Sequence, residues 1–79
     1  MASKLQTKTI KQYKDNGYFV INLIRSNVNG IADLLALKEN EKPIFIECKE
    51  KGDTLKPLQK FRGEEIKKYG CEWVLVKDN

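Results

Sequence analysis

The stretch that decides the fold spans residues 44–49 and reads IFIECK, an apolar run that ends in Glu47-Cys48-Lys49. Its β-branched and aromatic residues predict a strand. Side chains alternate across a strand, so Glu47 and Lys49 share one face and Cys48 takes the other. Charged groups beside so apolar a segment are costly unless they are paired or hold a metal ion. This segment is therefore a candidate functional site.

Helices and further strands are predicted on both sides of this segment. Apolar residues at helical spacing predict helices over residues 4–15 and 55–69, which end at Asn16-Gly17 and Gly70. Apolar runs predict strands at 18–24, 31–37 and 72–77, and the first of them suits a strand covered on both faces. The resulting order is α-β-β-β-α-β.

This order predicts an α/β fold with a mixed four-stranded sheet flanked by helices. The first three strands can form a meander, and the second helix can return the last strand alongside them. Trp73 and Phe61 are then most simply core residues. A chain of 79 residues is long enough for one domain and too short for two, so we expect residues 1–79 to form a single domain.

The register of the second and third strands can be tested by counting. In an antiparallel hairpin, residues that face each other share a face of the sheet, and their numbers add to a constant. A constant of 80 pairs Asp33 with Glu47, and 82 pairs Asp33 with Lys49. A tight loop at residues 39–41 gives 80. An odd constant would place Asp33 beside Cys48 instead and separate the carboxylates, unless a bulge near Gly30 re-aims the Asp33 side chain.

With an even register, the two carboxylates converge beside a lysine. They would repel each other without a cation. Mg²⁺ and Mn²⁺ prefer carboxylate, carbonyl and water oxygens, and the backbone carbonyl of Cys48 lies between Glu47 and Lys49. Lys49 can orient, or help to deprotonate, the water that attacks a phosphate. Two metal-binding carboxylates and a lysine beside them are the smallest set of groups that can catalyse hydrolysis of a phosphodiester.

Composition narrows the function classes. Lysine and arginine number 15 against 11 acidic residues, a net charge of +4 that favours a polyanionic partner, although a solvated surface of mixed charge gives the same balance. The absence of histidine excludes histidine-activated nucleophiles and histidine-ligated metals. No apolar run approaches the roughly 20 residues of a membrane span, so no membrane role is expected. Cys48 and Cys71, in apolar strand contexts and without a signal segment, indicate a reducing, cytoplasmic compartment.

The motifs Gly30-Ile31-Ala32-Asp33 and Glu47-Cys48-Lys49, followed by Gln59 in the next helix, resemble the VRR-NUC branch of the PD-(D/E)xK nuclease superfamily. The resemblance covers nearly the whole chain and is similar to small stand-alone members found in phages, which would place the protein in the host cytoplasm. It implies a restriction-endonuclease-like core. It also implies Mg²⁺- or Mn²⁺-dependent cleavage of DNA. Its metal ligands would be Asp33, Glu47 and the Cys48 carbonyl, with Lys49 as the water-activating residue and Gln59 as a supporting residue.

Stand-alone members are similar to Holliday-junction resolvases in forming homodimers, so the resemblance implies a homodimer that acts on branched DNA, such as junctions or flaps. Two active sites related by a two-fold axis could cut two strands symmetrically. The candidate DNA contacts lie on a basic helix face, in the loop before Asp33 and after Lys49, and each is equally compatible with an ordinary solvated surface. They are Lys8, Lys11, Arg25, Asn27, Lys51, Lys56 and Lys60.

The chain departs from the family pattern at two places. Ala32 stands where a proline is expected before the aspartate, and no acidic residue precedes Asp15, where many members carry an early glutamate. Gln6 is the candidate substitute, as a neutral ligand or water anchor. These departures keep open a catalytically weak or inactive DNA-binding module. A third alternative is a structural dimer in which Lys49 pairs with Glu47.

Overall fold

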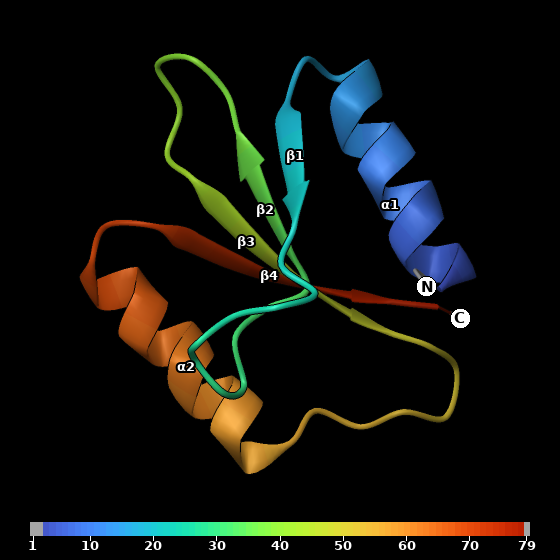
Figure 1. Ribbon diagram of the computed structural model, residues 1–79, viewed down its shortest axis with the longest axis vertical. Helices are drawn as coiled ribbons and strands as arrows, with labels where there is room; N and C mark the ends of the chain where they lie inside the picture. Colours follow the sequence, from blue (N-terminus) through green and yellow to red (C-terminus); the bar gives the residue numbers. More distant parts are fainter. Residues whose placement is uncertain (1–2, 79) are drawn as a thin grey trace.

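The computed structural model describes residues 3–78 and contains two helices and one four-stranded sheet over that range (Figure 1). Neither helix is long and apolar enough to cross a membrane. The order of the elements confirms the predicted α-β-β-β-α-β sequence. They are α1 (Lys4–Asp15), β1 (Phe19–Asn22), β2 (Leu34–Leu37), β3 (Ile44–Lys49), α2 (Pro57–Lys68) and β4 (Glu72–Lys77).

The sheet is mixed, as predicted, and its strands lie in the order β1-β2-β3-β4. The first two pairings are antiparallel and form the meander. The pairing of β3 with β4 is parallel, because α2 carries the chain back to the end of the sheet where β3 begins. The predicted fold class is therefore confirmed.

Local sequence signals account for the ends of both helices. The Ser3 hydroxyl accepts the Gln6 N–H at 3.1 Å, and the Gln6 side-chain oxygen accepts the Ser3 N–H at 3.3 Å, which closes a capping box at the start of α1. Pro57 opens α2, where a missing N–H does least harm. The chain then leaves the two helices through Gly17 and Gly70, both at positive φ, as the sequence predicts.

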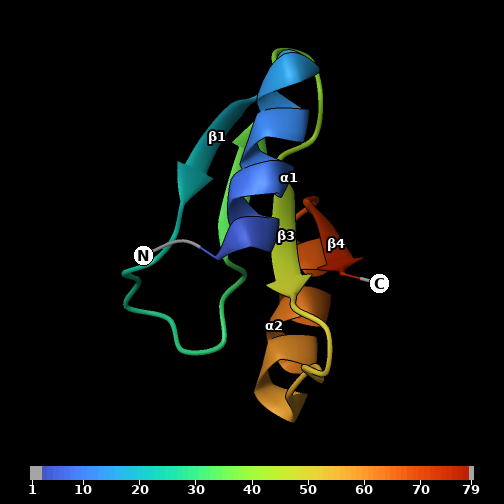
Figure 2. The ribbon, with the colours of Figure 1, turned by 90° about the vertical axis from the view of Figure 1, so that its right-hand side faces the viewer.

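The two helices lie on opposite faces of the sheet (Figure 2). Under α1, the side chains of Leu34, Ala36, Ile44 and Ile46 form the buried core. On the other face α2 packs against β4, so closely that a Cβ added at Gly63 would lie 2.9 Å from the Trp73 ring. This arrangement leaves one face of β1 and β2 outside the reach of α2.

Two predicted strands and one predicted helix are longer than the observed ones. The first strand ends at Asn22 and the second begins at Leu34, so residues 31–33 precede the strand instead of forming its start. The reason lies in the connecting loop, where Gly30 adopts φ +80° and sits against the side chain of Leu58. The loop therefore turns toward α2, and the pairing of β1 with β2 does not extend beyond Asn22 and Leu34. The second helix spans 57–68 in place of 55–69.

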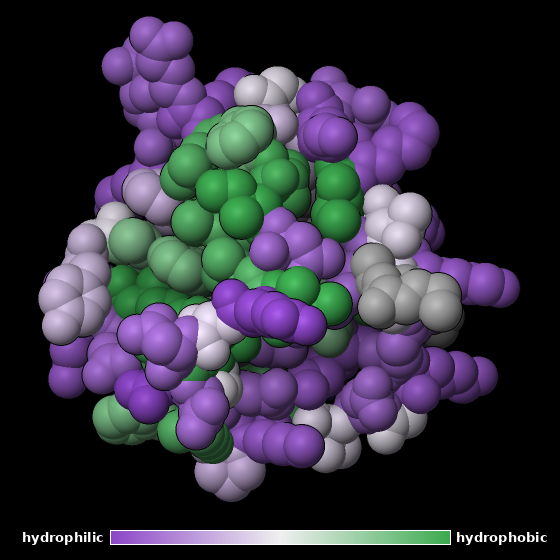
Figure 3. Space-filling model, in the orientation of Figure 1, coloured by the Kyte–Doolittle hydropathy of each residue, from purple (hydrophilic) through white to green (hydrophobic). Residues whose placement is uncertain are grey.

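Burial on the α2 face also differs from the prediction. Phe19 is 66% exposed and Phe61 57% exposed, so β1 is covered on one face only and Phe61 is not a core residue. The physical reason is that α2 packs against β4 at the far side of the sheet. Trp73 is half-buried against α2, in agreement with a packing role. Figure 3 shows hydrophobic side chains gathered over the strands on the face turned to the viewer.

Candidate functional site

The register between β2 and β3 brings Asp33 and Glu47 together. Leu34 faces Ile46, and Ala36 faces Ile44, so the numbers of paired residues add to 80. This confirms the even register that a tight turn predicts, and Asp33, directly before β2, therefore lies opposite Glu47. The turn itself is closed by the hydrogen bond from the Glu41 N–H to the Lys38 carbonyl at 3.1 Å.

Asp33 is held on the backbone of β3. Its Oδ2 accepts the N–H of Cys48 at 2.8 Å, and its own carbonyl accepts the N–H of Leu23 at 2.8 Å. The first bond fixes the carboxylate between the positions of Glu47 and Lys49. The second bond fixes the backbone at the end of the β1–β2 ladder. Together they fix both the side chain and the backbone of Asp33.

Glu47 is a buried carboxyl group with one unsatisfied oxygen. The residue is 2% exposed, and among residues 3–78 its Oε1 is buried without a hydrogen-bond partner. Burial is the largest cause that raises the pKa of Glu47; together with the charge of Asp33 and a hydrogen bond with it, and against the opposing effect of Lys49, it brings this pKa from 4.5 to about 8. Without a cation, this carboxyl group therefore keeps its proton at neutral pH.

Lys49 lies at the edge of this acidic pair. Its Nζ is 3.9 Å from Glu47 Oε2, and its side chain is 11% exposed. Because side chains alternate along β3, Lys49 lies on the same face of the sheet as Glu47. Cys48 lies on the opposite face, which α1 covers, and its thiol contacts the Thr9 hydroxyl at 3.8 Å. The face assignment predicted for these three residues is thus confirmed.

The donor set fits a hard divalent cation. Two carboxylates converge, and one buried oxygen has no other partner. Within the described range no three acidic or cysteine side chains lie close enough to hold a metal. Magnesium sites commonly use one or two carboxylates and take their remaining ligands from water and substrate phosphate. Asp33 and Glu47 match that pattern.

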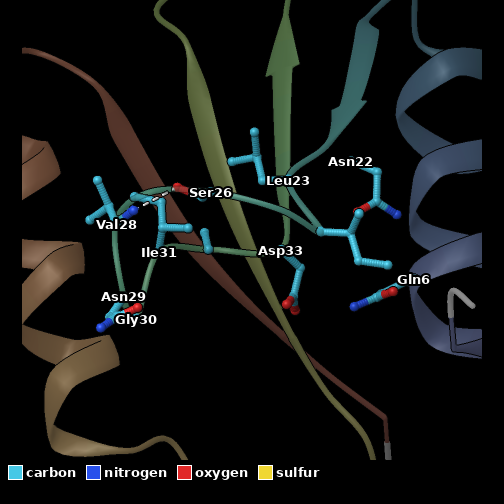
Figure 4. A pocket seen from close by; sticks show the side chains of 11 residues that line it. Gln6, Asn22, Leu23, Ser26, Val28, Asn29, Gly30, Ile31 and Asp33 are labelled. Atoms are coloured by element: carbon cyan, nitrogen blue, oxygen red, sulfur yellow. Dashed lines mark hydrogen bonds between the residues drawn. The ribbon is translucent and has the colours of Figure 1, made fainter.

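The two glutamines occupy the N-termini of the helices. The Gln59 side-chain oxygen accepts the Lys56 N–H at 2.9 Å, so Gln59 caps α2, and its supporting role stays a prediction. The role of the Cys48 carbonyl also stays a prediction. Gln6 is tied to Ser3 through its side-chain oxygen, and its side chain extends toward Asp33 (Figure 4).

A hollow of about 340 Å³ opens beside Asp33, between the start of α1 and the loop that joins β1 to β2 (Figure 4). The loop is fastened to α2, because the Arg62 Nε donates to the Asn29 carbonyl at 2.8 Å and Gly30 packs on Leu58. Sequence reasoning missed this hollow and the role of Arg62. Only Asn29-Gly30, as a turn signal, hinted at the loop.

Sequence reasoning also missed Glu50. Its carboxylate accepts the Leu5 N–H at 3.3 Å and so fixes the start of α1 beside the end of β3. An acidic residue after the motif carries no signal for a contact with a helix 45 residues away.

The predicted DNA contacts are all exposed and spread over α1, the two loops and α2. Lys11 forms an ion pair with Asp15 at 2.7 Å, which satisfies part of its charge within the helix. Arg25 and Asn27 lie in the same loop as the hollow but do not line it. Whether these residues touch DNA stays a prediction.

Comparison with known families identifies the VRR-NUC domain. The model of the VRR-NUC domain matches residues 4–77, which include both helices, the acidic pair and Lys49. Comparison with curated proteins gave no match.

Proposed function

Because the chain belongs to the VRR-NUC family of nuclease-type domains that process DNA, we propose that it is a metal-dependent endonuclease selective for branched DNA such as flaps and Holliday junctions. The observation that carries this proposal is the acidic pair. Asp33 is fixed by the Cys48 N–H, and Glu47, directly beside Lys49, keeps a buried oxygen that has no hydrogen-bond partner in the described part of the chain. Mg²⁺ or Mn²⁺ is the cofactor that this oxygen-rich pair suits.

In this proposal Asp33, Glu47 and the Cys48 carbonyl would hold the cation. When bound, the cation stabilises negative charge on the phosphate oxygens in the transition state. Its positive charge would also offset the burial and the charge of Asp33, which together raise the pKa of Glu47.

The protein side chains then supply orientation. The hydrogen bond to Cys48 prevents Asp33 from rotating, and burial does the same for Glu47. Lys49 has an ammonium at the rim of the pair, where it can contact a phosphate or orient the attacking water. Candidate DNA contacts on the exposed loops and helices would hold the flanking phosphates.

We further propose that the protein acts as a homodimer joined through the sheet face that α2 leaves open. Phe19 is 66% exposed there, and a chain of this size buries only about 60% of its unfolded surface by itself. Exposed apolar patches of this kind mark interaction surfaces. We expect the Phe19→Ser variant to sediment as a monomer and the Tyr69→Ser variant, altered at the end of α2, to sediment as a dimer. A wild-type monomer at high concentration would contradict the proposal.

The test of activity is cleavage of labelled four-way junction, flap and duplex DNA with Mg²⁺, Mn²⁺ or EDTA. We expect metal-dependent cutting of the branched DNAs and a loss of about 100-fold or more in the Lys49→Ala variant. Lys42→Ala, in the β2–β3 turn at the opposite end of the sheet, is the matched control. Cutting that persists in EDTA would refute the metal dependence.

The second candidate is a DNA-binding module that does not cut. It is favoured by one observation, namely that only two carboxylates of the described residues converge. This candidate predicts DNA binding that survives EDTA and no cleavage with either metal. A structural dimer held by the pair of Lys49 and Glu47 predicts neither DNA binding nor stabilisation by metal.

A further inference from the structure

The hollow beside Asp33 is chemically unlike the rest of the expected DNA surface. Of the residues 3–78 that line it, Asp33 alone is charged. The others are neutral: side chains with amide or hydroxyl groups alternate with aliphatic ones. Gln6, Asn22, Ser26 and Asn29 supply the polar groups, and Ile24, which is 69% exposed, supplies an apolar surface.

This lining does not suit a phosphate. No lysine or arginine of the described residues lines the hollow to neutralise a phosphate, and the carboxylate of Asp33 would repel one. Asparagine and glutamine side chains hydrogen-bond to the edges of bases, and apolar side chains pack on base faces. The lining therefore suits the uncharged part of a nucleotide.

The hollow is held open before any ligand arrives. Arg62 fastens the loop to α2 through the Asn29 carbonyl, and the Val28 N–H donates to the Ser26 hydroxyl at 3.0 Å. On the opposite wall, the capping box occupies the Gln6 side-chain oxygen, and Figure 4 shows the amide nitrogen turned toward Asp33. A preformed site loses less conformational entropy on binding.

We propose that this hollow binds one unpaired nucleobase next to the phosphate that Asp33 and Glu47 would engage. The inference rests on the proposed function and deepens it, because it identifies the feature of branched DNA that the site selects. A base in an intact duplex can enter only after unpairing and unstacking, which costs a few kcal/mol. An unpaired nucleotide at a flap or branch avoids most of that cost.

The test compares two duplexes that differ at one position. One carries a single unpaired 2-aminopurine, and the other carries an abasic residue there. Both have the same phosphates, so the ratio of their affinities cancels the backbone contribution. Affinity is measured by fluorescence anisotropy in EDTA, so that the result does not depend on cleavage.

We expect the wild type to bind the DNA with the unpaired base about tenfold more tightly, in line with the contribution of one base contact. The Asn22→Ala/Asn29→Ala variant removes two exposed amides of the hollow and should reduce the ratio to about one. Gln12→Ala removes an exposed amide on α1 away from the hollow and should keep the wild-type ratio. The fluorescence of 2-aminopurine should change on binding to the wild type and not to the double variant.

A wild-type ratio near one, or an unchanged ratio in the double variant, would refute the base site and leave the proposed nuclease standing. No binding to either DNA would refute both. Selective binding without cleavage in any metal would support the base site and refute the nuclease.

Discussion

Replacing Glu47 with glutamine should remove most of the pH dependence of stability in the metal-free protein. Burial, with Asp33 as the second cause, raises the pKa of Glu47 from 4.5 to about 8. Between these two pH values, the folded protein therefore holds a proton on Glu47 that the unfolded chain has already released. Raising the pH through this window lowers the free energy of unfolding, because the unfolded state binds fewer protons.

The size of the effect follows from linkage. Each pH unit inside the window changes the free energy of unfolding by about 1.4 kcal/mol, so a change from about pH 5.5 to about pH 8.5 lowers it by about 3 kcal/mol. For a domain of this size, that corresponds to a fall in Tm of roughly 12 to 24 °C. Glutamine resembles the protonated carboxyl in shape and charge, so the variant should keep nearly the same Tm across this range.

The assay is thermal unfolding followed by circular dichroism, in EDTA, across this pH range. Glu39→Gln, at an exposed position in the β2–β3 turn, is the matched control and should follow the wild type. Mg²⁺ or Mn²⁺ at pH 8 should raise the Tm of the wild type by mass action and should raise that of Glu47→Gln much less. A wild-type Tm that rises between pH 5.5 and 8.5, or a variant that retains the wild-type slope, would refute the reasoning.

Two further predictions concern the parts that position the site. Gly30→Ala should lower the free energy of unfolding by about 2 to 4 kcal/mol, because Gly30 has φ +80° and an added Cβ would lie 2.6 Å from Leu58 Cγ. The control is Gly52→Ala, at φ +91° with open space around it, whose chemical denaturation gives the cost of the backbone conformation alone. Equal losses of stability in the two variants would contradict the packing argument. Ser3→Ala should cost about 1 kcal/mol through loss of the N-cap of α1. Urea unfolding measures the Ser3→Ala change, and an unchanged midpoint would show that the cap contributes nothing.

The sequence by itself determined the order of the elements and the register of the central hairpin. Alternation in residues 44–49 placed Glu47 and Lys49 on one face, and the tight turn after β2 placed Asp33 opposite Glu47. These relations depend on covalent geometry and on residues close in sequence, so a single chain is enough to work them out. The bounds of α1 and β4 were predictable for the same reason.

Only the tertiary structure decided which surfaces are covered. The apolar sequence of β1 suggested burial on both faces, yet Phe19 is exposed because α2 docks against β4, with Gly63 on the Trp73 ring. The structure also adds that the Gln59 side-chain oxygen caps α2, while the site role that the resemblance implies for Gln59 stays a prediction. Where a helix docks depends on contacts between residues far apart in sequence, which no local pattern encodes.

The details of the site divide in the same way. The convergence of Asp33 and Glu47 follows from the register, whereas the raised pKa of Glu47 follows mainly from the burial of its side chain in the assembled fold. The loop that borders the hollow next to Asp33 is fastened to α2 by the hydrogen bond from Arg62 to the carbonyl of Asn29, 33 residues away. Local geometry thus determined that the two carboxylates converge, and long-range packing determined how deeply they are buried and which hollow lies beside them.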